Sequence, residues 1–399
     1  MIDAAILKRK ELALNSLLEI TQAINNNLPE NFLYRIYNFI LRGNLNISKL
    51  ALYVWKEEWV LATHFGVDLR HLTFHNDLFA SNIEIMPPNE AQRQAGYDIF
   101  DVVIPILHKH QVLAFVLATG VANEEVDTDF MQTLTNIIVV AIENKRLAQE
   151  QLAQEVLKKE LEIAQKVQNL LFPKSLPYNE HLQVKAYYTP HSSVGGDYYD
   201  YIPISDDQFL FCIADVSGKG MAAALMMANF QASLRTITRQ TTKLIKVIEE
   251  LNYLIHENAQ GENFITFFVG IYHNKEKTLN YINAGHNPPF LFTADGKFRR
   301  LDKGTTVLGV FDPLPFMEET TLAGLSNFLI FSYTDGLNET LNPQEELFGE
   351  ERIEHFLKHN YQHNLEQLHH NLIQTLKDFK RYTPYNDDIT LLSLKHTAP

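Results

Sequence analysis

The sequence predicts an α+β protein in which a long helix joins two domains. Three observations lead to this prediction. Helical and β-type segments share positions 1–145, an unbroken helical pattern runs from about Val126 to Leu171, and β-rich runs with embedded helices fill Val184–Leu394. We expect a first domain at 1–145, a connecting helix at 126–171 that overlaps the end of that domain, and a second domain at 178–396.

The first domain is expected to begin with two helices, at 3–27 and 30–42. The first has apolar residues at helical spacing, and Gly43 ends the second. Four β-type segments follow, at 47–55, 59–66, 101–108 and 112–120. Only 56–58 separates the first two, which predicts a hairpin. These elements predict a small α/β domain with an antiparallel sheet.

The connecting helix is expected to be long and paired. Apolar residues lie mostly three to five positions apart along 126–171, and no glycine or proline interrupts them before Pro173. A continuous helix would extend roughly 65 Å at 1.5 Å per residue, too far to fold back on one domain. We therefore expect it to pair with a second copy, as in a coiled coil, giving a homodimer. The alternative is two helices with a break near residue 150. The prolines of FPKSLP (172–177) mark the domain boundary.

The second domain is expected to be a helix-flanked β-sandwich. Runs of antiparallel strands are interrupted by paired helices, which favours two packed sheets with helices outside. The expected helices lie at 221–237, 242–259 and near 364–379. The expected strands lie at 264–272, 278–285, 289–294, 328–333 and 388–394.

Composition limits the function classes. The formal charge of −14, with no basic tract, argues against broad binding of nucleic-acid phosphates. The single cysteine, Cys212, excludes an intrachain disulfide and a CxxC zinc site. No run approaches the ~18–20 apolar residues of a membrane helix, and the N-terminus lacks the pattern of a secretory signal. We expect a cytoplasmic protein.

Four aspartates carry the functional signal: Asp197 in GGDYYD, Asp215 in IADVSGKG, Asp335 in SYTDG and Asp387 in NDDIT. Three of them adjoin apolar β-type runs, so strand ends meeting at one sheet edge would bring them together. Clustered carboxylates repel one another unless cations neutralise them, and oxygen-only ligands favour Mg²⁺ or Mn²⁺. Two such ions about 3.5–4 Å apart are a standard device for attacking a phosphate ester with metal-bound water.

Each of these motifs also has a plainer interpretation. Asp215 could simply form the turn between a strand and a helix, although the free carbonyl of Val216 could serve as a further hard ligand. Asp-Gly at 335–336 is common in ordinary turns. One aspartate of NDDIT could point to the sheet edge while the other fixes the turn. Asp200 is expected at the surface or behind the ligands, and His286 to close a turn rather than to bind phosphate.

The ordered motifs resemble a known family. SSVGGDYYD, FLFCIADVSGKGMAAALMMA, INAGHNPP, LGVF, FLIFSYTDGLNE, ELFGEERI and YNDDITLLSL are similar to the bacterial PP2C-type serine/threonine phosphatases of the RsbU/SpoIIE group. The resemblance covers about residues 155–395. It implies a PP2C-like β-sandwich with helices outside and two divalent metal ions, Mn²⁺ or Mg²⁺, whose bridging water is the nucleophile.

The resemblance also implies roles for individual residues. Asp215 would bridge both metals and the Val216 carbonyl would join one of them. Asp335 and Asp387 would hold the other metal, and Asp197 would be a ligand or a water-mediated partner. Asp387 is preferred to Asp388 because eukaryotic relatives have Asp-Asn there, with the first residue as ligand.

The first domain resembles a GAF-type sensory domain. The stretch VDTDFMQTLTNIIVVAIENKRL (126–147) is similar to the final helix of many GAF domains, and the size and element order of the block agree. No cysteine lies in this block, which excludes a covalently attached bilin. A degenerate domain used only for dimerisation or partner binding remains an alternative.

These resemblances imply a regulated signalling phosphatase. The first domain would sense a small molecule or protein, the connecting helix would convey its state, and the second domain would dephosphorylate a phosphoserine or phosphothreonine on a partner protein. By resemblance that partner is an anti-sigma-factor antagonist in a partner-switching pathway. The alternative is a metal-dependent scaffold that binds a phosphoprotein without turnover.

Overall fold

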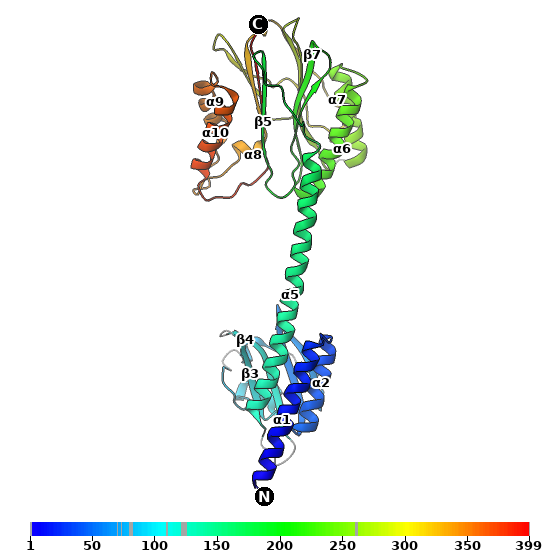
Figure 1. Cartoon of the computed structure of the whole chain (residues 1–399), viewed down its shortest axis with the longest axis vertical. Helices are drawn as coiled ribbons and strands as arrows, with labels where there is room; N and C mark the ends of the chain where they lie inside the picture. The colour runs from blue at the N-terminus through cyan, green and yellow to red at the C-terminus, as the bar shows by residue number, and fades with distance from the viewer. Residues whose placement is uncertain are drawn as a thin grey trace. The chain divides into compact units, whose positions relative to one another are not determined.

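The computed structural model describes residues 2–69, 71–72, 74–79, 83–108, 111–120, 126–259 and 262–398. The chain divides into two compact units, Met1–Val156 and Leu157–Pro399. Each unit has its own hydrophobic core and is described by itself (Figure 1). No helix among the described residues is long and apolar enough to span a membrane.

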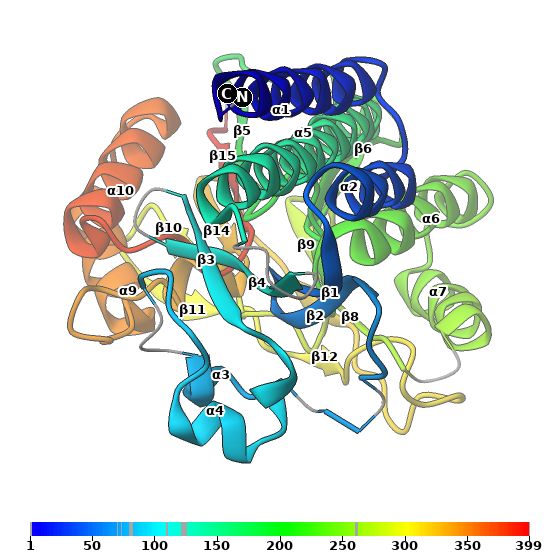
Figure 2. The ribbon, with the colours of Figure 1, turned by 90° about the horizontal axis from the view of Figure 1, so that it is seen from below.

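The first unit is an antiparallel sheet with a different layer on each face. Its strand order is β2-β1-β4-β3. Helices α1, α2 and the start of α5 run side by side (Figures 1 and 2) and pack on one face. Short helices and an aromatic cluster that includes Phe79, Tyr97 and Phe115 cover the other. The elements are α1 (Ile2–Asn25), α2 (Glu30–Asn44), β1 (Ile47–Lys56), β2 (Glu58–Phe65), α3 (Asn76–Phe79), α4 (Glu90–Gln94), η1 (Tyr97–Ile99), β3 (Val102–His108) and β4 (Gln111–Gly120).

The predicted helices and strands of this unit are confirmed. The hairpin of β1 and β2 turns at Glu57, whose positive φ of 68° closes the tight connection. Residues 50–54 of β1 are all buried, because helices lie on one side of the strand and aromatic rings on the other. This explains why β1 is a continuous apolar run rather than an alternating one.

The connecting helix is a single α-helix, α5 (Thr128–Asn169), of 42 residues. The expectation of an unbroken helix is therefore confirmed, and the alternative with a break near residue 150 is wrong. Its first turns bury Met131, Leu134 and Ile138 in the core of the first unit. Further along, apolar side chains are exposed, among them Leu152 and Ile163.

The second unit is a sandwich of two sheets with helices outside, as predicted. One sheet has the order β11-β10-β14-β15-β5, and the other has the order β12-β9-β8-β7-β6 with β13 paired to β9. Figure 1 shows α9 and α10 on one side of the sandwich and α6 and α7 on the other. Interdigitating side chains such as Phe211, Phe268, Ile330 and Leu392 fill the space between the sheets.

The strands and helices of this unit have the following bounds: β5 (Leu182–Thr189), β6 (Tyr198–Pro203), β7 (Gln208–Val216), α6 (Gly220–Thr238), α7 (Leu244–Ala259), β8 (Ile265–His273), β9 (Thr278–Ala284), β10 (Phe290–Thr293), β11 (Phe298–Arg300), β12 (Gly304–Thr305), β13 (Thr320–Leu322), β14 (Phe328–Tyr333), α8 (Asp335–Asn338), α9 (Gly349–Asn360), α10 (Leu365–Lys380) and β15 (Ile389–His396). The sequence did not predict α9, since only Ile353 and Leu357 of its twelve residues are buried.

Candidate functional site

The aspartates singled out from the sequence lie at one end of the sandwich. Asp197 directly precedes β6 and Asp215 lies near the end of β7, and these strands are antiparallel neighbours. In the other sheet, Asp335 follows β14 as the first residue of α8, and Asp387 precedes β15, the antiparallel neighbour of β14. In each antiparallel pair of strands, the two acids therefore lie at the same end of the sheet. These two ends face one another.

Asp197 connects the two sheets. Its side chain is buried, and its Oδ2 accepts hydrogen bonds from the hydroxyls of Thr334, at 2.7 Å, and Thr390, at 2.5 Å. Both threonines belong to the β14–β15 side of the sandwich. Burial raises the pKa of Asp197 well above its usual value, and the neighbouring charges of Asp215 and Asp388 raise it further.

The carboxylates interact as one electrostatic cluster. Burial raises the pKa of Asp215 to about 8, helped by Asp335, Asp387 and Asp388, while a hydrogen bond with Asp197 acts in the opposite direction. Burial also raises the pKa of Asp335 to about 6, with further contributions from Glu339 and Asp387. Proximity of like charges with little solvent makes these groups hold protons unless a cation replaces them.

Asp387 is partly exposed, and a lysine balances its charge. Lys219 Nζ lies 2.7 Å from Asp387 Oδ2 and also donates to the carbonyl of Asn386. Lys219 precedes α6, in the SGKG turn that follows Asp215. The turn that follows Asp215 is thus tied to the loop that carries Asp387.

Asp388 has a role that the sequence left open. Its side chain is buried, its Oδ1 accepts from the backbone N–H of His191, and its Oδ2 accepts from that of Gly196, both at 2.7 Å. Gly195 lies against the same carboxylate, since a Cβ there would stand 2.0 Å from Asp388 Oδ2. The two acids of NDDIT therefore have different contacts. Asp387 forms an ion pair with Lys219, and Asp388 holds the glycine segment (Gly195 and Gly196) before Asp197.

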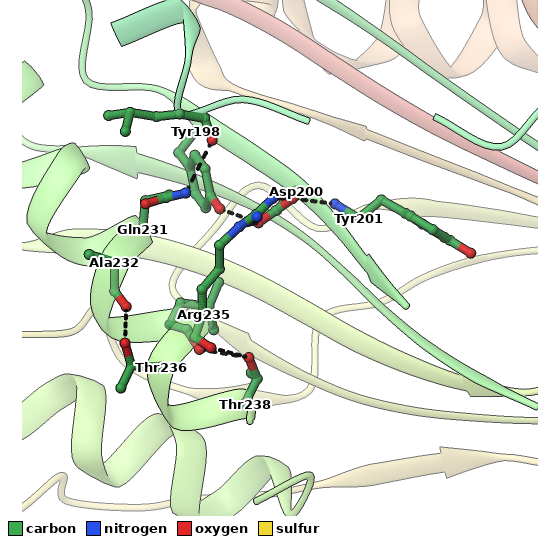
Figure 3. Close-up of polar contacts among 10 residues, drawn as sticks. Tyr198, Asp200, Tyr201, Gln231, Ala232, Arg235, Thr236 and Thr238 are labelled. Atoms are coloured by element: carbon green, nitrogen blue, oxygen red, sulfur yellow. Dashed lines mark hydrogen bonds and ion pairs between the residues drawn. The ribbon is translucent and has the colours of Figure 1, made fainter. Parts of the chain in front are cut away.

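Asp200 is not at the surface, so the surface alternative for this residue was wrong, while its expected place behind the ligands stays a prediction. It is completely buried in a bidentate ion pair with Arg235 of α6, at 2.8 and 2.9 Å (Figure 3). Tyr198 Oη and the backbone N–H of Tyr201 also donate to it. Arg235 could not be predicted from the sequence as the partner of Asp200, because the two residues lie 35 positions apart on different elements.

His286 has a structural environment. Its backbone N–H donates to Asn283 Oδ1 at 2.8 Å, and its Nδ1 lies 2.8 Å from Thr266 Oγ1. Burial lowers the pKa of His286 to about 4, so the ring is neutral near pH 7. The turn is thus closed by the Asn283 side chain.

The cluster suits divalent cations by its chemistry. Among the described residues, no group of three His, Cys, Asp or Glu side chains has the geometry to coordinate a metal ion. The hydrogen bond between Asp197 and Asp215 and the ion pair of Asp387 with Lys219 satisfy these carboxylates instead. The donors are nevertheless all oxygens, they are mostly buried, and they repel one another, which is the set that Mg²⁺ and Mn²⁺ prefer.

Comparisons with known proteins agree with this fold. Residues 205–397 match the family described as Stage II sporulation protein E (SpoIIE). The chain is 28% identical to Protein IcfG of Synechocystis sp. over 251 residues, which are 56% of this chain and 39% of IcfG. It is 27% identical to Phosphoserine phosphatase RsbU of Bacillus subtilis over 246 residues, which are 61% of this chain and 71% of RsbU.

A solved structure shares the fold. The SiaA-PP2C domain of Pseudomonas aeruginosa superposes with a TM-score of 0.54 at 20% sequence identity, covering 61% of this chain and 98% of that domain. The C-terminal unit therefore has the fold of a PP2C domain, and residues 205–397 of the chain match the SpoIIE family.

Proposed function

We propose that the chain is a regulated, metal-dependent protein serine/threonine phosphatase. The observation that carries the proposal is the cluster of Asp197, Asp215, Asp335 and Asp387, which both sheets deliver to one edge of the sandwich. Raised pKa values at several of these groups indicate a site with too much negative charge for the protein alone.

Each residue has a distinct part in this proposal. Asp215 lies between the acids of both sheets and would contact both ions, and the Val216 carbonyl would join one of them. Asp335 and Asp387 would hold the second ion, with Asp197 as a ligand or as a partner through water. When bound, Mn²⁺ or Mg²⁺ would supply positive charge that polarises a phosphoryl group and activates water. Asp388 would position Gly196 and Asp197 rather than bind the ions.

The names of the relatives support a substrate class. RsbU carries the name phosphoserine phosphatase, and most of its length is covered by the match. We propose a phosphorylated protein as substrate, with an anti-sigma-factor antagonist as the specific candidate. The net charge of −14 suits a protein substrate better than a nucleic acid.

The first unit would supply regulation. We propose a GAF-like sensory role for it, α5 as the element that conveys its state, and a homodimer paired along the exposed apolar residues of α5. The expected cytoplasmic location agrees with the single buried cysteine.

The direct test is hydrolysis of a phosphoserine peptide by the full-length chain, with and without Mn²⁺, beside Asp215→Asn. Metal-dependent turnover that falls to the background rate in the variant supports the proposal. Calorimetry of Mn²⁺ binding accompanies the assay. Binding without turnover favours the alternative of a phosphoprotein-binding scaffold, and absence of both contradicts the metal-dependent phosphatase.

A further inference from the structure

The C-terminal end of α5 makes a polar contact with the acidic site. Gln168, the penultimate residue of this helix, is buried. Its Nε2 donates to the carbonyl of Gly195 at 2.7 Å, and its Oε1 accepts from the N–H of the same residue at 3.2 Å. One carboxamide therefore satisfies both backbone polar groups of Gly195.

The segment that Gln168 holds leads directly into the cluster. Gly195 is bonded to Gln168, Gly196 donates to Asp388 at 2.7 Å, and Asp197 accepts from two threonines of the other sheet. Three successive residues thus have three separate anchors. Space is tight, because a Cβ on Gly195 would meet Asp388 and one on Gly196 would lie 2.9 Å from the Val216 carbonyl. A small shift of Gly195 must therefore be transmitted to its neighbours.

The end of α5 is itself fixed in the second unit. Gln231 of α6 donates to the carbonyl of Leu171 at 3.2 Å. Phe172 is buried, with its ring centroid 4.9 Å from that of Tyr188 and 5.0 Å from that of Tyr199. The aromatic packing of Phe172 sets where the last turn of α5 lies, and Gln168 is the member of that turn that reaches the glycine segment.

A carboxamide is the group that this position requires. It supplies a donor and an acceptor side by side, whereas a carboxylate only accepts and a methionine does neither. Leaving a buried backbone N–H or carbonyl without its partner costs free energy, which the segment relieves by moving.

We propose that Gln168 is a positioning residue through which α5 sets the geometry of the acidic site. Displacement of the last turn of α5 moves Gly195, and with it the hydrogen bond of Gly196 to Asp388 and the position of Asp197, so that metal affinity changes. This inference rests on the proposed metal-dependent function and names a route for its regulation.

The test compares Gln168→Met with Gln231→Met in the full-length chain. Both replace a buried carboxamide with a side chain of similar length, but Gln231 lies in α6 and contacts Leu171 rather than the glycine segment. Hydrogen exchange of peptides spanning 194–198 is measured without metal, and Mn²⁺ affinity is measured by calorimetry. Gln168→Met should speed exchange in that segment and weaken Mn²⁺ binding about 10–100-fold, the usual effect of losing a group that orients metal ligands. Gln231→Met should leave both near wild type.

A second variant at position 168 tests the inference in case Gln168→Met does not fold. Gln168→Glu keeps the length and the acceptor but cannot donate to the Gly195 carbonyl when ionised, so it should resemble Gln168→Met. Wild-type exchange and affinity in both Gln168 variants would overturn the inference, as would an equal change in Gln231→Met. Failure of the wild type to bind Mn²⁺ would instead contradict the proposed function, while faster exchange in the Gln168 variants would still support the positioning role.

Discussion

At the scale of single residues, the acidic site depends on glycine as well as on carboxylates. Gly195 packs so closely that a Cβ would lie 2.0 Å from Asp388 Oδ2 and 2.5 Å from Tyr188 Oη. Asp388 in turn accepts two backbone hydrogen bonds, which fix the segment before Asp197. A side chain at position 195 would therefore disturb a carboxylate that is not itself an expected ligand.

We predict that Gly195→Ala lowers the free energy of unfolding by about 1–3 kcal/mol, the usual cost of overpacking, and weakens Mn²⁺ binding. Urea denaturation and calorimetry measure the two effects. Gly43→Ala is the control, because nothing lies within 4 Å of its Cβ position. It should be neutral or stabilising by up to about 1 kcal/mol. An unaltered metal affinity in Gly195→Ala would contradict the tight packing described here.

A buried histidine makes stability depend on pH. His369 of α10 has its Nε2 2.7 Å from Ser393 Oγ of β15, and burial lowers the pKa of its ring to about 3. The unfolded chain binds a proton near pH 6.5, whereas the folded chain does not until about pH 3. Stability from this group is therefore complete above pH 6.5 and is lost as the pH falls.

We predict that the wild type loses about 2 kcal/mol relative to His369→Gln between pH 6.5 and pH 5.0, since one proton is worth about 1.4 kcal/mol per pH unit. Urea denaturation at both pH values, without metal, measures the difference. His370→Gln, at the exposed neighbouring position, should follow the wild type. Parallel losses in all three proteins would show that His369 is not buried in its neutral form.

At the scale of secondary structure, α5 stands out for its exposed apolar residues. A helix in water normally buries such residues against another element. Along α5 they recur mostly on a helical spacing, and the exposed residues are Leu147, Leu152, Val156, Leu157, Ile163 and Val167. This pattern favours a second helix as their partner.

We predict that Leu152→Lys with Val156→Lys converts a dimer into a monomer, because charges placed in an apolar seam lose their hydration on pairing. Sedimentation velocity across a range of protein concentrations measures the change. Gln151→Lys with Gln154→Lys adds the same charge at exposed polar positions of the same turns and should leave the dimer intact. A wild-type monomer at high concentration would refute pairing through α5.

The elements that the sequence predicted well are those with a strong local signal. The long apolar runs of β8 and β14 lie inside the sandwich, and α5 has no glycine or proline to break it. By contrast, α9 buries only two side chains, and α8 starts at Asp335, where Asp-Gly resembled an ordinary turn. Weak periodicity and short length left these helices without a pattern to detect.

In the site too, features with a local sequence signal were predicted and those that depend on distant contacts were not. Motifs identified the acids, because three of the four adjoin an apolar run typical of a strand. The contacts of Asp388 with Gly196, of Asp200 with Arg235, and of Gln168 with Gly195 were not foreseen. They join residues 192, 35 and 27 positions apart, and local sequence carries no information on which distant groups meet.

At the scale of the whole molecule, one helix has buried residues in both units. Met131 and Leu134 of α5 are buried in the first unit, while Gln168 is buried against the glycine segment of the second. The part of α5 between these ends is largely exposed. The two ends of α5 are therefore packed within their units, whereas the exposed middle is free to serve pairing and regulation.

We predict that replacing residues 147–163 with a flexible Gly/Ser segment of equal length leaves both units folded but uncouples turnover from dimerisation. If α5 pairing sets the position of its last turn, phosphatase turnover per subunit in the wild type should vary with protein concentration across the dimerisation range. In the replaced chain turnover should be constant, because a flexible segment transmits no position. Circular dichroism establishes folding, and phosphopeptide hydrolysis measures turnover.

Replacing residues 147–163 with a rigid helical segment tests whether pairing alone, rather than the particular sequence of α5, controls turnover. An unrelated heptad-repeat segment of the same length, which pairs through its own apolar positions, should restore a dimer and with it a turnover that depends on concentration. If turnover per subunit is the same in all three proteins at every concentration, then the position of α5 does not govern the site, and regulation must reach the second unit by contacts outside this helix.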